Sequence, residues 1–309
     1  MTIRLGLGLP QMRQYDIGKD IPDVARAAER TGYESLWVFE RALFPDPPTQ
    51  GLYGVEGLPW PEGYRGVAEP LVSLTLAAAA TERALLGTSV LIAPLHVPFQ
   101  LAKSLATLDA ASGGRVVAGL GTGWSHDEYA AASVRPFAER GAALDELIGV
   151  CRAVWGPDPV GYDGEVTRIA SAAVGPKPAR PIPILLAASS GRARRRLVDR
   201  ADGWMPTGIG AGAVADQLRQ LRDLAAERGR TEPISTTLRV NARYGAAAAA
   251  GAERREFHGG VDRIVEDLTA YAGLGLDEIL LDLQSTTRDA EELKDVAAEV
   301  YEKARAAGI

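Results

Sequence analysis

LATLDAASGGRVVAGLGTGW, residues 105–124, is the stretch of the chain from which the fold is most directly predicted. Its first part continues an apolar pattern with helical spacing, and the triplet Ser112-Gly113-Gly114 ends that helix sharply. A run of small and β-branched apolar residues, 116–120, follows and is typical of a buried strand. The stretch therefore predicts a helix, a buried strand and a glycine-rich turn in direct succession.

The same alternation of strand-like and helix-like segments runs along the whole chain. Strands are expected at residues 3–9, 35–39, 85–92, 116–120, 183–187, 204–206, 236–242 and 278–283. Helices are expected at residues 21–31, 70–81, 99–112, 137–155, 192–201, 214–228, 261–274 and 290–306. Strand-then-helix repetition implies parallel strands with right-handed crossovers, and eight such units close a (β/α)8 TIM barrel. An open doubly wound sheet is the alternative, but it rarely has eight regular units without a second domain. We therefore expect residues 1–309 to form a single barrel domain.

Three connections are longer than the others, at residues 40–69, 156–181 and 243–260. The second contains VGYDGEVTRI, which is typical of a hairpin. The first and third follow the second and seventh predicted strands, on the face where a barrel carries its active site. Long loops in a compact domain are usually lids or binding loops.

The composition excludes several classes of protein. The chain has 46% hydrophobic and 24% charged residues, which is typical of a globular protein, and its net charge of -6 disfavours nucleic acid as a partner. Its single cysteine, Cys151, excludes an internal disulfide and is expected to be a buried small hydrophobe. The N-terminus lacks the pattern of a signal peptide, and no segment is apolar enough to span a membrane. A cytoplasmic protein with no membrane association is expected.

The segment LLAASSGRARRR, residues 185–196, predicts an anion site. A strand runs into the turn Ser189-Ser190-Gly191 and a helix begins there, so free backbone N–H groups and the helix dipole face the turn. Positive charge is added by Arg192, Arg194, Arg195 and Arg196. An arginine run alone is usually a solvated helix face, so a phosphate site and a solvated face remain alternatives.

Residues just beyond the second and third strands are candidates for chemistry. Glu40 and Arg41 end the segment LWVFER, and His96 follows the third strand in APLHVP. A structural ion pair is the alternative for Glu40 and Arg41, and a structural role is the alternative for His96. The sequence has neither a metal-ligand spacing such as HExxH nor a GxSxG elbow, which disfavours a metal site and a hydrolase.

Two further features concern flat ligands. GLGTGW, residues 119–124, resembles a dinucleotide fingerprint but has Trp124 at the place of the third glycine. It is better interpreted as a turn that lets the backbone approach a flat ring, or as a plain tight turn. The aromatic residues Tyr53, Trp60, Tyr64 and Trp124 indicate an apolar or planar partner, or else they only pack the lid.

Taken together, these segments resemble the luciferase-like monooxygenase family, in particular its branch that uses the deazaflavin coenzyme F420. The resemblance covers nearly the whole chain and depends on the order and spacing of the segments. The segments are RLGLGLP, AAERTGYESLWVFER, TERALLGTSVLIAP, LATLDAASGGRVVAGLGTGW, FAERGAALDELI, VGPKPAR, ILLAASS, RADGW and GLGLDEILLDLQ.

The resemblance implies which residues form the site. It implies a non-prolyl cis peptide bond between Ser89 and Val90, which braces the flavin or deazaflavin ring from behind. Glu40 would face the ring and, with His96, is a candidate catalytic residue that supplies or accepts a proton. The remaining implied cofactor-binding residues are Gly121, Thr122 and Gly123 near the ring and Ala187, Ala188, Ser189, Ser190 and Gly191 near the phosphate.

The implied activity is hydride transfer between F420 and a small organic substrate in a homodimeric enzyme. Relatives that oxidise sugar phosphates with F420 carry an acidic residue directly after the GTG turn and a histidine after the second strand. This chain has Trp124 and Arg41 there, so those catalytic assignments do not carry over. An FMN-dependent monooxygenase and a flavin-binding protein without turnover are the alternatives. The arginines of residues 192–196 favour F420, because its phosphate and oligoglutamate tail are strongly anionic.

Overall fold

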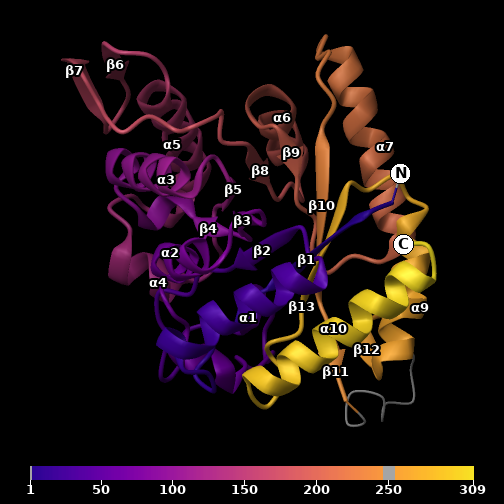
Figure 1. Ribbon diagram of the computed structural model, residues 1–309. Helices are drawn as coiled ribbons and strands as arrows, with labels where there is room; N and C mark the ends of the chain where they lie inside the picture. The colour runs from indigo at the N-terminus through magenta and orange to yellow at the C-terminus, as the bar shows by residue number, and fades with distance from the viewer. Residues whose placement is uncertain (1, 246–254) are drawn as a thin grey trace.

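The computed structural model describes residues 2–245 and 255–309, whose strands close into a barrel surrounded by helices (Figure 1). In the order of their hydrogen bonding, the strands are β3 (Leu85–Thr88), β2 (Ser35–Val38), β1 (Arg4–Gly8), β13 (Glu278–Asp282), β10 (Ser235–Asn241), β9 (Gly203–Trp204), β8 (Ile184–Leu186), β5 (Val116–Gly121) and β4 (Leu91–Ile92). All pairs are parallel, and β3 also pairs with β5, which closes the sheet. Because β3 and β4 are two halves of one barrel strand, the barrel has eight strands. The predicted (β/α)8 TIM barrel is confirmed.

Each barrel strand is followed by at least one helix that packs on the outside of the barrel. These helices are α1 (Ile17–Thr31), α2 (Pro70–Ala80), α3 (Pro98–Ser112), α5 (Arg140–Trp155), α6 (Gly191–Arg200), α7 (Ala211–Glu227), α9 (Val261–Ala272) and α10 (Ala290–Ala306). Additional elements are the 3-10 helices Leu52–Gly54, Glu62–Gly66, Ala93–Leu95 and Phe137–Glu139, the helix α4 (His126–Ala132), the antiparallel hairpin of β6 (Val160–Asp163) and β7 (Arg168–Ala172), and the pair β11 (Arg243–Tyr244) and β12 (His258–Gly259). The hairpin predicted within residues 156–181 is therefore confirmed. The alanine-rich part of the third long connection, residues 246–254, lies outside the described residues.

Three helix predictions were wrong in detail. The helix expected at 214–228, α7, begins at Ala211. The first helix begins at Ile17 and not at residue 21, because the Asp16 carboxylate accepts the N–H groups of Gly18 and Lys19 at 3.1 and 3.2 Å and caps the helix earlier. The helix expected over 137–155 is divided, with a 3-10 turn before α5. Cys151 in α5 is fully buried as predicted, and burial raises the pKa of its thiol to about 12.

A separate layer of buried apolar side chains, contributed by residues in or next to the barrel strands, consists of Trp37, Val117, Leu185, Met205 and Leu280. Glycine is required beside this layer. A Cβ on Gly87 would lie 2.2 Å from the Trp37 ring, so the glycine in β3 makes room for the tryptophan. Met205 of this layer also lines the cavity described below. No helix in the described parts of the chain is both long and apolar enough to cross a membrane.

Candidate active site

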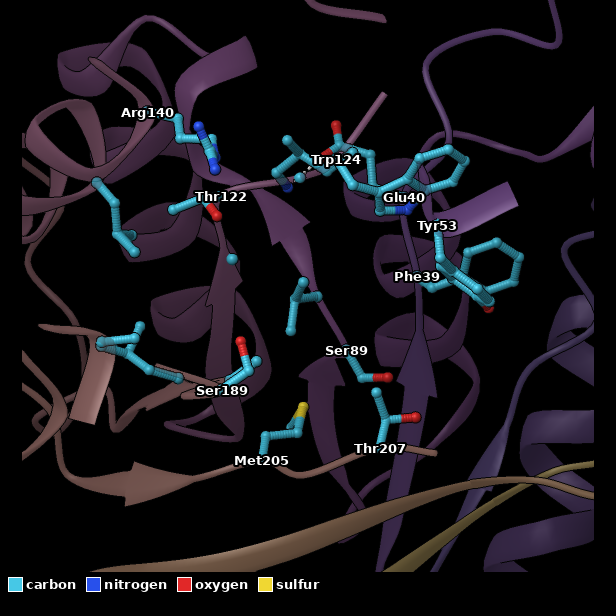
Figure 2. A pocket seen from close by; sticks show the side chains of 18 of the residues that line it. Phe39, Glu40, Tyr53, Ser89, Thr122, Trp124, Arg140, Ser189, Met205 and Thr207 are labelled. Atoms are coloured by element: carbon cyan, nitrogen blue, oxygen red, sulfur yellow. Dashed lines mark hydrogen bonds between the residues drawn. The ribbon is translucent and has the colours of Figure 1, made fainter. Parts of the chain in front are cut away.

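A cavity of about 810 Å³ lies at the carboxyl ends of the barrel strands, where (β/α)8 enzymes place their active sites (Figure 2). Among the residues predicted to bind a cofactor, those that line it are Glu40, Ser89, Val90, Gly121, Thr122, Gly123, Ala187, Ser189 and Ser190. The others do not line it. Of these, Ala188 is buried and Gly191 is the first residue of α6. The candidate catalytic residue His96 does not line the cavity either, and lies beside Glu40. The structure thus brings most of the predicted set together around one cavity.

The third barrel strand is interrupted between β3 and β4 by a cis peptide bond between Ser89 and Val90. This is the bond that the family resemblance implies at this position. Val90 lies on the cavity wall against Gly121, where an added Cβ would come within 2.6 Å of the Val90 side chain. Gly121 is therefore required by the packing of the wall itself.

Arg239 on β10 holds the residue that precedes this bond. Its guanidinium donates hydrogen bonds to the carbonyl and hydroxyl oxygens of Ser89 and, at 2.6 Å, to the Asp282 carboxylate. The Arg239 and Asp282 side chains are only 12% and 7% exposed. Sequence reasoning missed Arg239, although a charged residue between Leu238 and Val240 in a predicted barrel strand was a signal that could have found it.

Glu40 lies directly beyond β2, and both of its carboxyl oxygens have a partner. Oε2 accepts the backbone N–H of Ile92, and Oε1 lies 2.9 Å from His96 Nε2. This contact between His96 and Glu40 becomes an ion pair when the imidazole is protonated. Burial lowers the pKa of His96, but the carboxyl groups of Glu40 and Glu69 raise it by more, and the net pKa lies above its ordinary value. The alternative role for Glu40 and Arg41 was a structural ion pair, but these two residues are not paired with each other.

One end of the cavity is basic and carries the predicted anion site. Ser190 caps α6 by accepting the N–H of Ala193 at 3.3 Å, and Ser189 precedes it on the wall. Of the four arginines that follow, Arg192 and Arg196 line the cavity, whereas Arg194 bonds Gln220 on α7. The arginine that sequence reasoning missed here comes from a different unit of the barrel. It is Arg140 at the start of α5, which the fold brings to the same end.

The opposite side of the cavity is an aromatic wall, which we define as Tyr53, Trp60, Tyr64 and Trp124. The ring centroids of Trp60 and Trp124 are 4.8 Å apart, and those of Tyr53 and Trp124 are 5.5 Å apart. Trp60 is buried behind the others, while Tyr53, Tyr64 and Trp124 line the cavity. Figure 2 shows Phe39, Tyr53 and Trp124 on one side of the cavity and Arg140, Thr122 and Ser189 on the other.

Arg41 links the aromatic wall to α4 through a contact with the Trp124 ring and a hydrogen bond to Glu128. Its guanidinium carbon lies 5.0 Å from the centroid of the Trp124 ring, and its Nη1 donates a 2.8 Å hydrogen bond to Glu128. Glu128, on α4, also accepts the N–H of Ala42 at 2.7 Å and is almost completely buried. Burial raises the pKa of Glu128, although Arg41 opposes this shift. Arg41 and Glu128 are therefore partners that hold the loop after β2 against α4.

Comparison with known proteins identifies the family to which this barrel belongs. A family model described as luciferase-like monooxygenase matches residues 7–308, which is nearly the whole chain. The protein belongs to the luciferase-like monooxygenase family.

Relatives of this luciferase-like protein differ in how much is known of them. An uncharacterized protein of Mycobacterium tuberculosis is 36% identical over 210 residues, which cover 67% of this chain and 73% of that protein. An F420-dependent glucose-6-phosphate dehydrogenase of Kineococcus radiotolerans is 30% identical over 249 residues, which cover 79% of this chain and 69% of that protein. Among solved structures, the monooxygenase RslO1 of Streptomyces bottropensis has the same fold, with a TM-score of 0.79 at 19% identity, covering 99% of this chain and 100% of that one.

Within the luciferase-like barrel, the segment GLGTGW serves the fold as well as the cavity. A Cβ on Gly119 would lie 1.8 Å from the Thr88 carbonyl oxygen, so this glycine is needed where β5 passes β3. Gly123 has a φ of 67°, a left-handed conformation that favours glycine and turns the chain toward Trp124. In the described residues, no group of three or more His, Cys, Asp or Glu side chains is arranged to hold a metal ion.

Proposed function

We propose that this luciferase-like protein is an oxidoreductase that uses coenzyme F420 for hydride transfer to or from a small organic substrate. The observation that carries the proposal is the division of one cavity into a basic end and an aromatic side, with the carboxyl group of Glu40 on its wall. An anionic cofactor with a flat ring system fits such a cavity, because its phosphate would meet the helix start and its ring would lie over apolar wall.

The residues present fit this cofactor at both ends. Ser189, Ser190 and the start of α6 offer hydroxyl and backbone donors for a phosphate, and Arg140, Arg192 and Arg196 surround them. Val90 and residues 121–123 form the wall where the ring would lie. When bound, F420 supplies the hydride chemistry, and the protein supplies binding and orientation.

F420 is favoured over FMN by the amount of positive charge at the basic end. Arg196 is already paired with Asp145 at 2.7 Å, but neither Arg140 nor Arg192 has a carboxylate partner in the part of the chain that the structure describes. Arg140 contacts only the carbonyl and ring of Phe137, so the charges of both guanidinium groups lack a carboxylate partner among the described residues. Two such groups suit a cofactor whose anionic tail extends beyond a single phosphate. The F420-dependent relative from Kineococcus radiotolerans points in the same direction.

Glu40 is the residue that we propose to hold or accept the proton that accompanies hydride transfer. Its carboxyl group lines the cavity, and the Ile92 N–H and His96 hold it in one orientation. His96 acts through Glu40 and is therefore a positioning residue. Glu40→Gln would keep the shape of the side chain and remove its ability to exchange a proton.

The proposal is tested by titrating the purified protein with F420 and with FMN and following fluorescence. We expect F420 to bind more tightly, and we expect Arg140→Ala and Arg192→Ala each to weaken its binding about 10-fold, which corresponds to the loss of one charge-assisted hydrogen bond. Added salt would weaken binding to the wild type more than binding to either variant. Arg219→Ala, on the exposed face of α7, is the matched control.

Tighter binding of FMN than of F420 would contradict this assignment. It would favour the second candidate, an FMN-dependent monooxygenase, whose phosphate could occupy the same helix start and whose activity the family description names. Substrate-dependent consumption of oxygen with reduced FMN identifies that activity. A protein that binds either cofactor without turnover of any substrate would be a binding protein.

A further inference from the structure

We infer that the substrate is an uncharged, planar aromatic compound that stacks on Tyr53 and Trp124. The inference rests on the proposed function for the reaction, but its binding step stands on the cavity alone. Tyr53, Tyr64 and Trp124 of the aromatic wall line the cavity, and Phe39, next to Glu40, lines it as well. Aromatic groups contact each other favourably in tilted and offset arrangements, which this wall offers to a flat ligand.

The rings of the wall are held in place before any ligand binds. The Gln50 side chain donates a 2.8 Å hydrogen bond to the Trp124 carbonyl, and Trp60 Nε1 donates one of 3.0 Å to the Gln50 carbonyl. The Thr49 hydroxyl donates a 2.9 Å hydrogen bond to Asp127. The loop after β2 is thereby fixed on the segment that leads into α4. A surface ordered in advance costs less entropy when a ligand binds.

Tyr53 stands at the mouth of the cavity and leaves part of its ring free. It is 52% exposed although it is a large apolar side chain, and its φ of 56° places it in the left-handed region that residues other than glycine adopt rarely. Its only ring contact among the described residues is the edge contact with Trp124. An exposed ring beside a cavity, supported on one edge, is suited to stack on an incoming ligand.

The charges on this side of the cavity are already neutralised. Arg41 is paired with Glu128 at 2.8 Å, and Arg239 is paired with Asp282 at 2.6 Å. All four side chains are almost completely buried. A substrate with a phosphate group would have to compete with these carboxylates for a cation, whereas an uncharged ring would leave the pairs intact. The free positive charge lies at the other end, where the cofactor is proposed to bind.

The reaction of such a substrate can be balanced without a further reactant. For an aromatic ketone, the carbonyl carbon takes up the hydride from reduced F420 and the carbonyl oxygen takes up a proton, which gives a secondary alcohol and oxidised F420. Two electrons are transferred with the hydride. Glu40, on the same cavity wall, is the group proposed to deliver the proton.

The test compares three probes by isothermal titration calorimetry on the full-length protein, with and without F420. The probes are acetylnaphthalene, its saturated analogue acetyldecalin and glucose 6-phosphate. We expect acetylnaphthalene to bind about 10-fold more tightly than acetyldecalin, a difference of about 1.4 kcal/mol that aromatic stacking on the wall can supply. Tyr53→Ala and Trp124→Ala should each abolish most of this difference. Val55→Ala, an exposed apolar residue of the same loop that does not line the cavity, should preserve it.

Trp124→Phe separates the loss of the ring surface from a folding defect, because it keeps an aromatic ring and should keep most of the preference. Equal binding of the planar and saturated ketones would overturn the inference, and so would tighter binding of glucose 6-phosphate. A preference that persists in both alanine variants would overturn it too. Failure of the proposed function has a different signature, in which acetylnaphthalene still binds with its dependence on Trp124 while F420 does not bind.

Discussion

Among single residues, Glu40 and His96 form a pair in which only Glu40 reaches the cavity. His96 lies behind it, with its side chain 21% exposed. The pKa of His96 is raised in the folded protein, so its charged form stabilises the fold fully below the ordinary pKa of 6.5. That contribution is lost as the pH rises through the higher pKa of the folded state.

His96→Gln should therefore lower the free energy of unfolding at pH values well below 6.5, by on the order of 1 kcal/mol, and have little effect above the raised pKa. Urea unfolding of wild type and variant across this range measures the difference. His126→Gln, an exposed histidine, is the control. A destabilisation by His96→Gln that is the same at every pH would show that the imidazole acts through packing and not through its charge.

The same variant distinguishes a positioning role from a merely structural one. If His96 orients Glu40, His96→Gln should lower kcat and shift the pH profile of turnover while KM changes little, because the substrate contacts remain. Unchanged pH dependence of kcat would contradict the positioning role.

At the scale of the elements, β10 contributes the cation that holds the interrupted third strand. Arg239 reaches across to Ser89 and keeps Asp282 of β13 neutralised, so one side chain links three barrel strands. Loss of one member of a buried ion pair leaves the other charge uncompensated, which is more costly than loss of the pair.

Arg239→Met should accordingly lower the free energy of unfolding by about 3 kcal/mol. The double variant Arg239→Met/Asp282→Leu should recover part of that loss, since no buried charge remains. Arg219→Met, which breaks an exposed pair with Asp216, should change stability by less than about 1 kcal/mol. Chemical denaturation of the three variants measures these differences. A double variant less stable than Arg239→Met would contradict the uncompensated charge, and would show that Asp282 stabilises the fold through its other contact, with the Gln284 N–H.

On the scale of the whole molecule, closure of the barrel depends on the close approach of β3 and β5. Gly119 lies at that contact, where an added Cβ would overlap the Thr88 carbonyl oxygen. Backbone cannot move away from such a contact without disturbing both strands and the cavity wall above them.

Gly119→Ala should therefore destabilise the protein by about 4 kcal/mol or prevent its folding. Gly212→Ala in α7, where an added Cβ would meet no atom within 4 Å, should be neutral or stabilise by up to about 1 kcal/mol. Thermal and urea unfolding of the pair measure the contrast. Equal stability of the two variants would mean that the barrel adjusts at this contact.

The sequence by itself determined the barrel, the family and most residues of the cavity wall. Strand and helix periodicity is local, so the alternation around residues 105–124 identified eight repeating units before any contact was known. The segment before α6 indicated the helix start with its two serines, and the segment at the end of β5 indicated the glycine-rich turn. Both features depend only on residues that are neighbours along the chain.

Only the tertiary structure decided which distant residues share the cavity and how their charges are paired. Arg140 joins the basic end from another unit, Arg239 reaches Ser89 from a strand 150 residues away, and Arg41 is neutralised by Glu128 on a helix that the sequence did not predict. The physical reason is that an ion pair is set by distances of a few ångströms across the barrel. Closure of the barrel fixes those distances, and no pattern along the chain records them.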